Sequence, residues 1–214
     1  MRNRKPFQLR RALTMWNAGL AAFSILGAIP FVYDRISVSV SDGFFRTACV
    51  TNFFSKPSLH LWAWLFSFSK IIELGDTLFI VLRKTPRLAF LHWYHHITVL
   101  VLSWFAFTVD TAVSIWFGCL NFCVHSIMYT YYAVKASGRS VPEGVAQFIT
   151  ILQISQMFVG FGSNLLAYLQ FSRGMECSFD GTFICMGLFI YATYILLFIN
   201  FFYQRYCHKI HIRN

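Results

Sequence analysis

Long apolar stretches, separated by short polar segments, recur along the whole chain. Six of them are long enough to cross a bilayer as helices, because about 20 apolar residues span the hydrocarbon core. They cover residues 12–33, 58–82, 88–108, 112–134, 144–170 and 183–206. The pattern predicts an all-α integral membrane protein with six transmembrane helices. We expect one membrane-embedded domain over residues 1–214, since the chain shows no internal repeat or low-complexity tract.

The composition points the same way. Hydrophobic residues make up 57% of the chain and charged residues only 12%, about half the roughly 25% of a soluble domain. This balance argues against a soluble globular protein and against disorder. The first apolar stretch is too long for a signal-peptide core and lacks a clear small-residue cleavage site, so we expect it to be retained as a helix.

The Lys and Arg residues behind the net charge of +10 are distributed unevenly between the two sides of the membrane. Thirteen Lys and Arg residues lie in the N-terminal segment, the second and fourth loops and the tail, whereas four lie in the first and fifth loops. This alternation places both termini in the cytosol. In a soluble protein the excess would suggest nucleic acid. Membrane topology accounts for the excess here. We therefore expect the lipid bilayer as a partner, and no nucleic acid.

Six cysteines form no metal-binding pattern. Cys49 and Cys177 both fall in predicted non-cytosolic loops, where an oxidising lumen permits a disulfide. We therefore expect a bridge between these two loops. The alternative is two unrelated free thiols.

Polar side chains inside the spans are costly, so each needs a partner or a role. Helical spacing places Lys70 and Glu73 on one face of their span, with Asp76 beside it. A buried ion pair that only joins helices is the structural alternative. The next span opens with His92, His95 and His96 at i, i+3 and i+4, which form one stripe.

The remaining spans add polar positions at the same depth. Asn121, His125, Met128, Tyr129 and Tyr132 share one helical face, and Gln153 and Gln156 share another. At about 1.5 Å rise per residue, the polar residues of four spans lie roughly 9–14 Å inside the cytosolic ends. We therefore predict that these residues line a common polar chamber. Such a chamber inside a membrane protein is most simply interpreted as an active or transport site.

Three kinds of chemistry fit such a chamber. A di-iron oxygenase of the desaturase kind needs more histidines than the seven present, although a mononuclear metal site could use three histidines with Glu73 or Asp76. A transporter or receptor is the non-enzymatic alternative. Metal-free acyl transfer needs only the side chains themselves, because a neutral imidazole can attack a thioester and form an acyl-imidazole. We favour this last reading, with no metal ion.

Four motifs now carry a resemblance. They read Lys70-x-x-Glu73-x-x-Asp76-Thr77, His92-x-x-His95-His96, Asn121-x-x-x-His125-x-x-Met128-Tyr129-x-Tyr131-Tyr132 and Thr150-x-x-Gln153-x-x-Gln156. In this order on successive spans they resemble the very-long-chain fatty acid elongases, the ELO family of 3-oxoacyl-CoA synthases. The resemblance runs from Arg2 to the tail. The His-Trp-Tyr-His-His form, with Arg87 before it, is similar to the branch that uses saturated and monounsaturated acyl chains.

The resemblance implies a barrel-like bundle of six helices around a narrow acyl tunnel, in the endoplasmic reticulum membrane. It implies condensation of a long-chain acyl-CoA with malonyl-CoA, with no cofactor beyond these CoA thioesters. The reductase and dehydratase of the elongation cycle are the expected protein partners, and the oligomeric state is left open, a homo-oligomer included. Family members usually have a further span before the basic segment, which we expect this chain to lack.

We assign catalysis to eight residues, His92, His95, His96, His125, Asn121, Lys70, Glu73 and Asp76. The resemblance makes His95 the nucleophile, and we expect the other histidines to move protons and hold it. Glu73 and Asp76 are expected to orient histidines or Lys70. Asn121, with Tyr129 or Tyr132, is a candidate for binding the oxyanion and the malonyl carboxylate.

Substrate binding involves two further sets. Gln153 and Gln156 are expected to complete the polar network. The anionic nucleotide end of CoA should meet the basic cytosolic rim, since Lys and Arg bind phosphate. The candidates there are Lys84, Arg87, Lys135 and Arg139.

Overall fold

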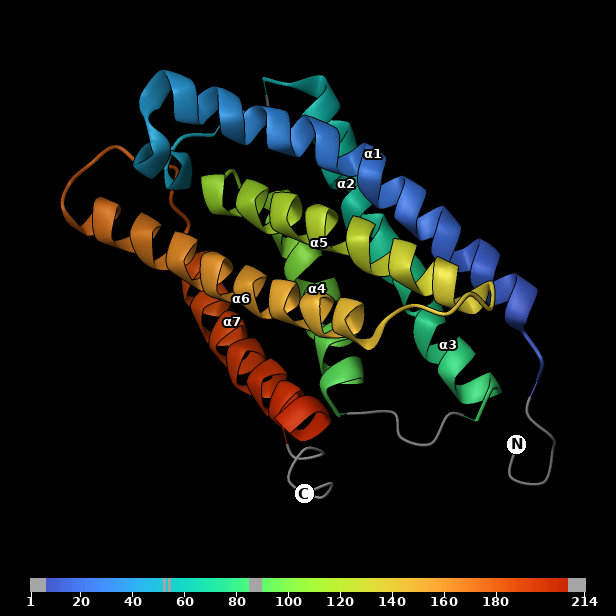
Figure 1. Ribbon diagram of the computed structural model, residues 1–214. Helices are drawn as coiled ribbons and strands as arrows, with labels where there is room; N and C mark the ends of the chain where they lie inside the picture. Colours follow the sequence, from blue (N-terminus) through green and yellow to red (C-terminus); the bar gives the residue numbers. More distant parts are fainter. Residues whose placement is uncertain (1–6, 52, 54, 85–89, 208–214) are drawn as a thin grey trace.

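The computed structural model describes residues 7–51, 53, 55–84 and 90–207, and over these ranges the chain is helical and has no strand (Figure 1). The elements are α1 (Arg10–Asp42), η1 (Phe44–Ala48), α2 (Pro57–Glu73), α3 (Gly75–Leu82), α4 (Phe90–Thr108), α5 (Ala112–Ala136), α6 (Glu143–Ser172), α7 (Gly181–Phe202) and the π-helical turn η2 (Tyr203–Cys207). Each predicted span thus corresponds to helix.

Local sequence explains several helix starts. Pro57 opens α2, where its missing N–H is not needed. The side chain of Thr111 accepts a hydrogen bond from the backbone of Ser114 at the start of α5. The side chain of Asp180 does the same for Phe183 at the start of α7. Such caps satisfy amide groups that have no partner within the helix.

Two boundaries differ from the predicted ranges. Helix α1 continues to Asp42, well beyond the predicted end at 33. The range predicted as one helix, 58–82, is two helices with Leu74 between them. At that junction the amides of Leu74 and Thr77 bond to carbonyls three residues earlier, Ile71 and Leu74, as in a tighter 3₁₀ turn. Apolar length does not reveal this break, because the apolar stretch resumes at Leu78 after Glu73, Asp76 and Thr77.

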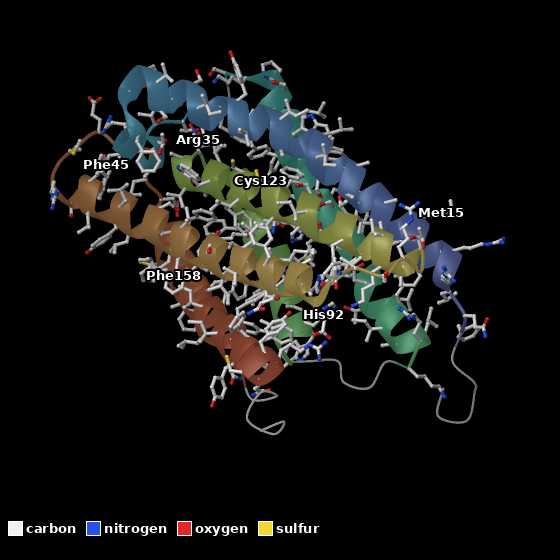
Figure 2. All side chains as sticks on the ribbon, in the orientation of Figure 1. Met15, Arg35, Phe45, His92, Cys123 and Phe158 are labelled. Carbon is white, nitrogen blue, oxygen red and sulfur yellow. A yellow bond between two sulfur atoms is a disulfide. The ribbon has the colours of Figure 1, made fainter. Side chains whose placement is uncertain are left out.

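The six long helices pack in a cyclic order. Helix α1 lies against α5, α5 against α6, α6 against α7, α7 against α4, α4 against α2, and α2 against α1. Figure 1 shows α1, α5 and α6 side by side, with α7 and α4 on the other side of the bundle. Aromatic side chains fill the centre, among them Phe31, Phe66, Phe122 and Tyr194. Met15 and Phe158, by contrast, are exposed on its outer surface (Figure 2).

Among the described residues, four helical segments are long and apolar enough to cross a membrane, namely α1, α5, α6 and the α7–η2 segment Gly181–Cys207. The other two predicted spans correspond to shorter or more polar helices. Helix α2 stops after 17 residues, and the first two turns of α4 contain three histidines. The histidines of the candidate site therefore reduce the hydropathy of α4, whereas α2 is short because the helix breaks at Leu74.

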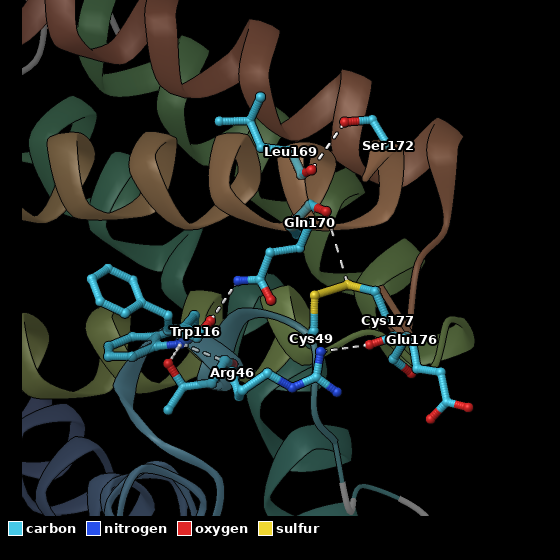
Figure 3. The surroundings of a disulfide bond; sticks show 12 residues. Arg46, Cys49, Trp116, Leu169, Gln170, Ser172, Glu176 and Cys177 are labelled. Carbon is cyan, nitrogen blue, oxygen red and sulfur yellow. Dashed lines mark hydrogen bonds between the residues drawn. A yellow bond between two sulfur atoms is a disulfide. The ribbon is translucent and has the colours of Figure 1, made fainter. Parts of the chain in front are cut away.

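A disulfide joins Cys49, just after η1, to Cys177, in the loop between α6 and α7. These are the two cysteines that the sequence places in loops on one side of the membrane. Two further links tie the same segments together (Figure 3): Arg46 donates to the carbonyl of Glu176 at 2.8 Å, and Gln170 donates to that of Phe45 at 2.7 Å. We call this part of the bundle the disulfide end.

Buried charges lie beside these links. The carboxylate of Asp34 accepts from Arg35 at 2.5 Å and from Lys56 at 2.8 Å. Arg35 also donates to the carbonyl of Thr47 at 2.5 Å. Arg35 and His92 lie at opposite ends of the bundle (Figure 2). We call the second of these, where α3 ends and α4 begins, the histidine end.

Candidate active site

A buried ion pair connects α2 to α5. The ammonium of Lys70 lies 2.6 Å from Oε1 of Glu73 and donates to Oδ1 of Asn121 at 2.8 Å. The two charged side chains are only 2% and 4% exposed. Their i, i+3 spacing on one helix allows the pairing, as the sequence predicts. Lys70 has three N–H donors, so one remains beyond these two contacts.

His125 extends this network along α5. Its Nε2 lies 3.3 Å from the amide nitrogen of Asn121, and its Nδ1 lies 3.7 Å from Oε2 of Glu73. The ring also packs edge-on against Tyr129, with 5.3 Å between the ring centroids. Glu73 and Asn121 therefore hold both Lys70 and His125, which agrees with the orienting role expected for Glu73.

The three histidines of α4 have different surroundings. Nε2 of His92 is 3.1 Å from the hydroxyl of Thr77, and the ring of His92 lies 4.4 Å from that of His96. His95 faces α7, where its ring packs against Tyr194 at 5.0 Å and Phe198 at 6.3 Å. The three histidines of the predicted stripe thus contact different helices, since His92 contacts α3 and His95 contacts α7.

Three histidine nitrogens at this end are buried without a hydrogen-bond partner among the described residues. They are Nδ1 of His95, of His96 and of His125. Buried polar atoms are nearly always hydrogen-bonded, because leaving one unpaired costs about 1–3 kcal/mol. A cluster of such atoms beside a buried ion pair provides groups that can accept a proton or attack an electrophile.

Asp76 has other partners than those expected. We expected it to orient histidines or Lys70, but its two oxygens accept from the indole of Trp16 at 2.7 Å and from the hydroxyl of Tyr129 at 2.8 Å. The break at Leu74 separates Asp76 from the helix that carries Lys70. The hydroxyl of Tyr129 is accordingly engaged with Asp76, whereas Tyr132 is 42% exposed.

Helix α6 contributes its glutamines less directly. The amide of Gln153 donates to the sulfur of Met128 at 3.2 Å, which joins α6 to α5. Gln156 is buried. The contact of Gln153 joins α6 to α5 through a sulfur atom, and the role of both glutamines in the polar network stays a prediction.

The predicted basic rim is partly described. Lys84 follows α3 in a left-handed backbone conformation, and Lys135 and Arg139 are exposed around the end of α5. Lys135 donates to the hydroxyl of Tyr131 at 3.1 Å. Arg87 lies outside the described residues.

A small cavity of about 20 Å³ lies between α1, α2, α4 and α5. Five of its twelve lining residues are phenylalanines, and its polar lining residues are Ser67, Ser103 and Ser114. That volume suits about one water molecule. No group of three or more His, Cys, Asp or Glu residues within residues 7–51, 53, 55–84 and 90–207 is placed to hold a metal ion.

Two neighbours of the site were not predicted from the sequence. Trp16 reaches Asp76 across 60 positions of sequence, and no local pattern indicates that pairing. Tyr194 is different, because Tyr191, Tyr194 and Phe198 are spaced as one face of a helix. That spacing predicts a shared helix face, but not that the face points toward the histidines.

Taken together, these features define the class as a multi-pass membrane protein with a buried histidine-rich site. A model described as "ELO: GNS1/SUR4 family" matches residues 1–212. The chain belongs to this family of fatty acid elongases.

Individual relatives support the same family assignment. Very long chain fatty acid elongase 6 of Drosophila melanogaster is 44% identical over 209 residues, which are 96% of this chain and 66% of that relative. Very long chain fatty acid elongase 3 of Homo sapiens is 42% identical over 206 residues, 96% of this chain and 76% of that relative. Long chain fatty acid elongase 1 of Caenorhabditis elegans is 40% identical over 207 residues. The chain thus spans just under two thirds of the fly protein's length.

Proposed function

We propose that this protein condenses a long-chain acyl-CoA with malonyl-CoA, through an acyl group carried on His95. The products are a 3-oxoacyl-CoA two carbons longer, CO₂ and free CoA. The observation that carries the proposal is the cluster of three buried histidine nitrogens that make no hydrogen bond to a described residue, beside the Lys70–Glu73 pair. Membership of the fatty acid elongase family supports it.

In the first half-reaction a ring nitrogen of His95 attacks the thioester carbonyl. The oxyanion that forms receives hydrogen bonds from the third N–H of Lys70 and the amide of Asn121. Collapse breaks the C–S bond, and the CoA thiolate leaves with a proton passed on by His96 or His92. His125, which Glu73 and Asn121 hold in place, helps to balance the charge that develops in this step.

In the second half-reaction the C–C bond to the malonyl carboxylate breaks. Its electron pair forms an enolate as CO₂ leaves, and the enolate carbon attacks the acyl carbon. The acyl–nitrogen bond breaks and returns neutral His95. One proton is consumed overall, by the CoA thiol. We assign the malonyl carboxylate to Tyr132, because the hydroxyl of Tyr129 is engaged with Asp76.

The substrates would enter from the histidine end. We place the nucleotide end of CoA on Lys84, Arg87, Lys135 and Arg139, and the acyl chain inside the bundle, directed toward the disulfide end. The cyclic packing order of the six helices supports a barrel, and an acyl tunnel along its axis is part of the same proposal. The same proposal places the protein in the endoplasmic reticulum membrane with cytosolic termini, beside a reductase and a dehydratase.

The test is covalent labelling with a radiolabelled acyl-CoA alone, in the absence of malonyl-CoA. We expect a hydroxylamine-sensitive adduct that is lost in His95→Ala. His60→Ala is the matched control, since His60 packs against Phe53 and Phe107 far from the other histidines. The control should label like the wild type.

Adding malonyl-CoA to the labelled protein should release the label as 3-oxoacyl-CoA with stoichiometric CO₂. An unchanged adduct in His95→Ala would overturn the nucleophile assignment. Product formation without any adduct would overturn the two-step route, and stoichiometric iron in the active sample would overturn the metal-free mechanism.

A further inference from the structure

The short helix α3 is held in place by hydrogen bonds from two other helices. Asp76, near its start, accepts from Trp16 of α1 at 2.7 Å and from Tyr129 of α5 at 2.8 Å. Both carboxylate oxygens are thereby occupied by neutral donors. A carboxylate with two such donors is fixed in direction, because each bond constrains one oxygen.

The ring of Trp16 also packs directly on the junction before α3. A methyl group added at Gly75 would lie 2.6 Å from the indole, closer than atoms can approach. The absence of a side chain at Gly75 thus lets the indole approach the backbone while its N–H reaches Asp76. Gly75 and Asp76 together fix where α3 begins.

The next residue transmits this position to the histidines. The hydroxyl of Thr77 lies 3.1 Å from Nε2 of His92, whose ring is 4.4 Å from that of His96. The bond fixes the direction of the ring, and because a hydroxyl can both donate and accept, it can form with either tautomer of a neutral imidazole. Thr77 therefore determines the orientation of His92.

We propose that Trp16 and Thr77 are positioning residues, which act through α3 to hold His92 in its reactive orientation. The inference rests on the proposed function, because it gives these residues a role in acyl transfer. Neither side chain needs to touch substrate. Their effect is on how often the histidine cluster adopts the arrangement in which it can pass a proton.

The experiment measures acylation in a single turnover at several acyl-CoA concentrations. Thr77→Val removes the hydroxyl at nearly constant volume, and Trp16→Phe removes the indole N–H but keeps a ring against Gly75. We expect each variant to lower the maximal rate of adduct formation about tenfold. The half-saturating acyl-CoA concentration should change less than twofold. Thr77→Ser, which keeps the hydroxyl, should restore most of the rate.

Trp116→Phe is the matched control for the tryptophan. The indole of Trp116 donates to the carbonyl of Thr47 at 3.2 Å, at the disulfide end (Figure 3). The control thus loses the same kind of bond far from α3 and should keep the wild-type rate. A purely structural role would lower the fraction of molecules that react and leave the rate of that fraction unchanged.

The double variant Trp16→Phe/Thr77→Val tests whether both residues act through α3. We expect its rate to fall by clearly less than the product of the two single effects, since both changes release the same element. Wild-type rates in both single variants, or a loss in Trp116→Phe equal to that in Trp16→Phe, would overturn the inference. A wild type that forms neither adduct nor product would instead overturn the proposed function.

Discussion

Both ends of the bundle bury charged side chains, but they satisfy them in different ways. At the disulfide end Asp34 is fully buried and Arg35 is 4% exposed. The two oxygens of Asp34 accept from Arg35 and Lys56, and Arg35 also donates to two backbone carbonyls. Each charge in this network has a partner. The Cys49–Cys177 disulfide joins the segments beside it.

The histidine end combines a similarly tight pair with unsatisfied atoms. Lys70 and Glu73 neutralise each other at 2.6 Å, yet three nearby histidine nitrogens make no hydrogen bond within the described part of the chain. The comparison shows that buried charge alone does not indicate function. A buried oxygen that makes no hydrogen bond to a described residue, Oε1 of Gln170, also lies at the disulfide end. The difference is that the unpaired atoms at the histidine end are imidazole nitrogens, which can accept a proton or attack an electrophile.

The largest effect should come from breaking the pair at the histidine end. Lys70→Met leaves Glu73 charged and buried, which costs about 3–5 kcal/mol in the free energy of unfolding. Condensation should fall at least about 100-fold, since the oxyanion loses a donor. Thermal unfolding in detergent and turnover with labelled malonyl-CoA measure the two effects.

The double variant Lys70→Met/Glu73→Gln serves as the control for stability. It should unfold with a smaller loss than Lys70→Met alone, because no charge is left unpaired. Activity should stay as low as in the single variant. Full activity in either variant would show that the ion pair is structural only, like the one at the disulfide end.

Asp34→Asn should give the next largest loss, of stability alone. It leaves Arg35 charged and buried with only carbonyl partners, at a cost of about 3 kcal/mol. Turnover per folded molecule should remain within about twofold of the wild type. Lys56→Met is the milder control, since Arg35 still pairs with Asp34, and we expect about 1 kcal/mol. A specific loss of turnover in Asp34→Asn would contradict the division between the two ends.

Removing the disulfide should have a moderate effect. Cys49→Ala/Cys177→Ala removes a link across 128 positions of sequence. We expect about 2 kcal/mol, the low end of the usual range, because inserted helices already restrict the unfolded chain. Unfolding followed with and without reductant measures it, since the wild type in reductant should match the double variant. An unchanged melting temperature in both would refute the expectation.

The smallest effect concerns α6. Gln153→Leu removes one hydrogen bond to the sulfur of Met128, and hydrogen bonds between membrane helices contribute about 0.6 kcal/mol on average. Turnover should fall less than about threefold if Gln153 only joins α6 to α5. A loss as large as that of Lys70→Met would instead place Gln153 among the groups that touch substrate.

Much of the helical layout follows from the sequence, because apolar length and helical spacing are local properties. The i, i+3 pairing of Lys70 with Glu73 and the histidine stripe of α4 are read from one helix alone. The break at Leu74 is not predicted, since the junction is fixed by a tryptophan from another helix against Gly75. The hydrogen bonds that Asp76 accepts from Trp16 and Tyr129 likewise depend on other helices.

The sequence by itself determined that the chain is a helical membrane protein and which polar side chains its spans contain. It did so because hydrocarbon tolerates few polar groups, so each one stands out. Only the tertiary structure decided how these groups pair. It directs Asp76 to Trp16 and Tyr129, His92 to Thr77 and His95 to Tyr194. Such choices depend on how helices distant in sequence pack together, which no local pattern contains.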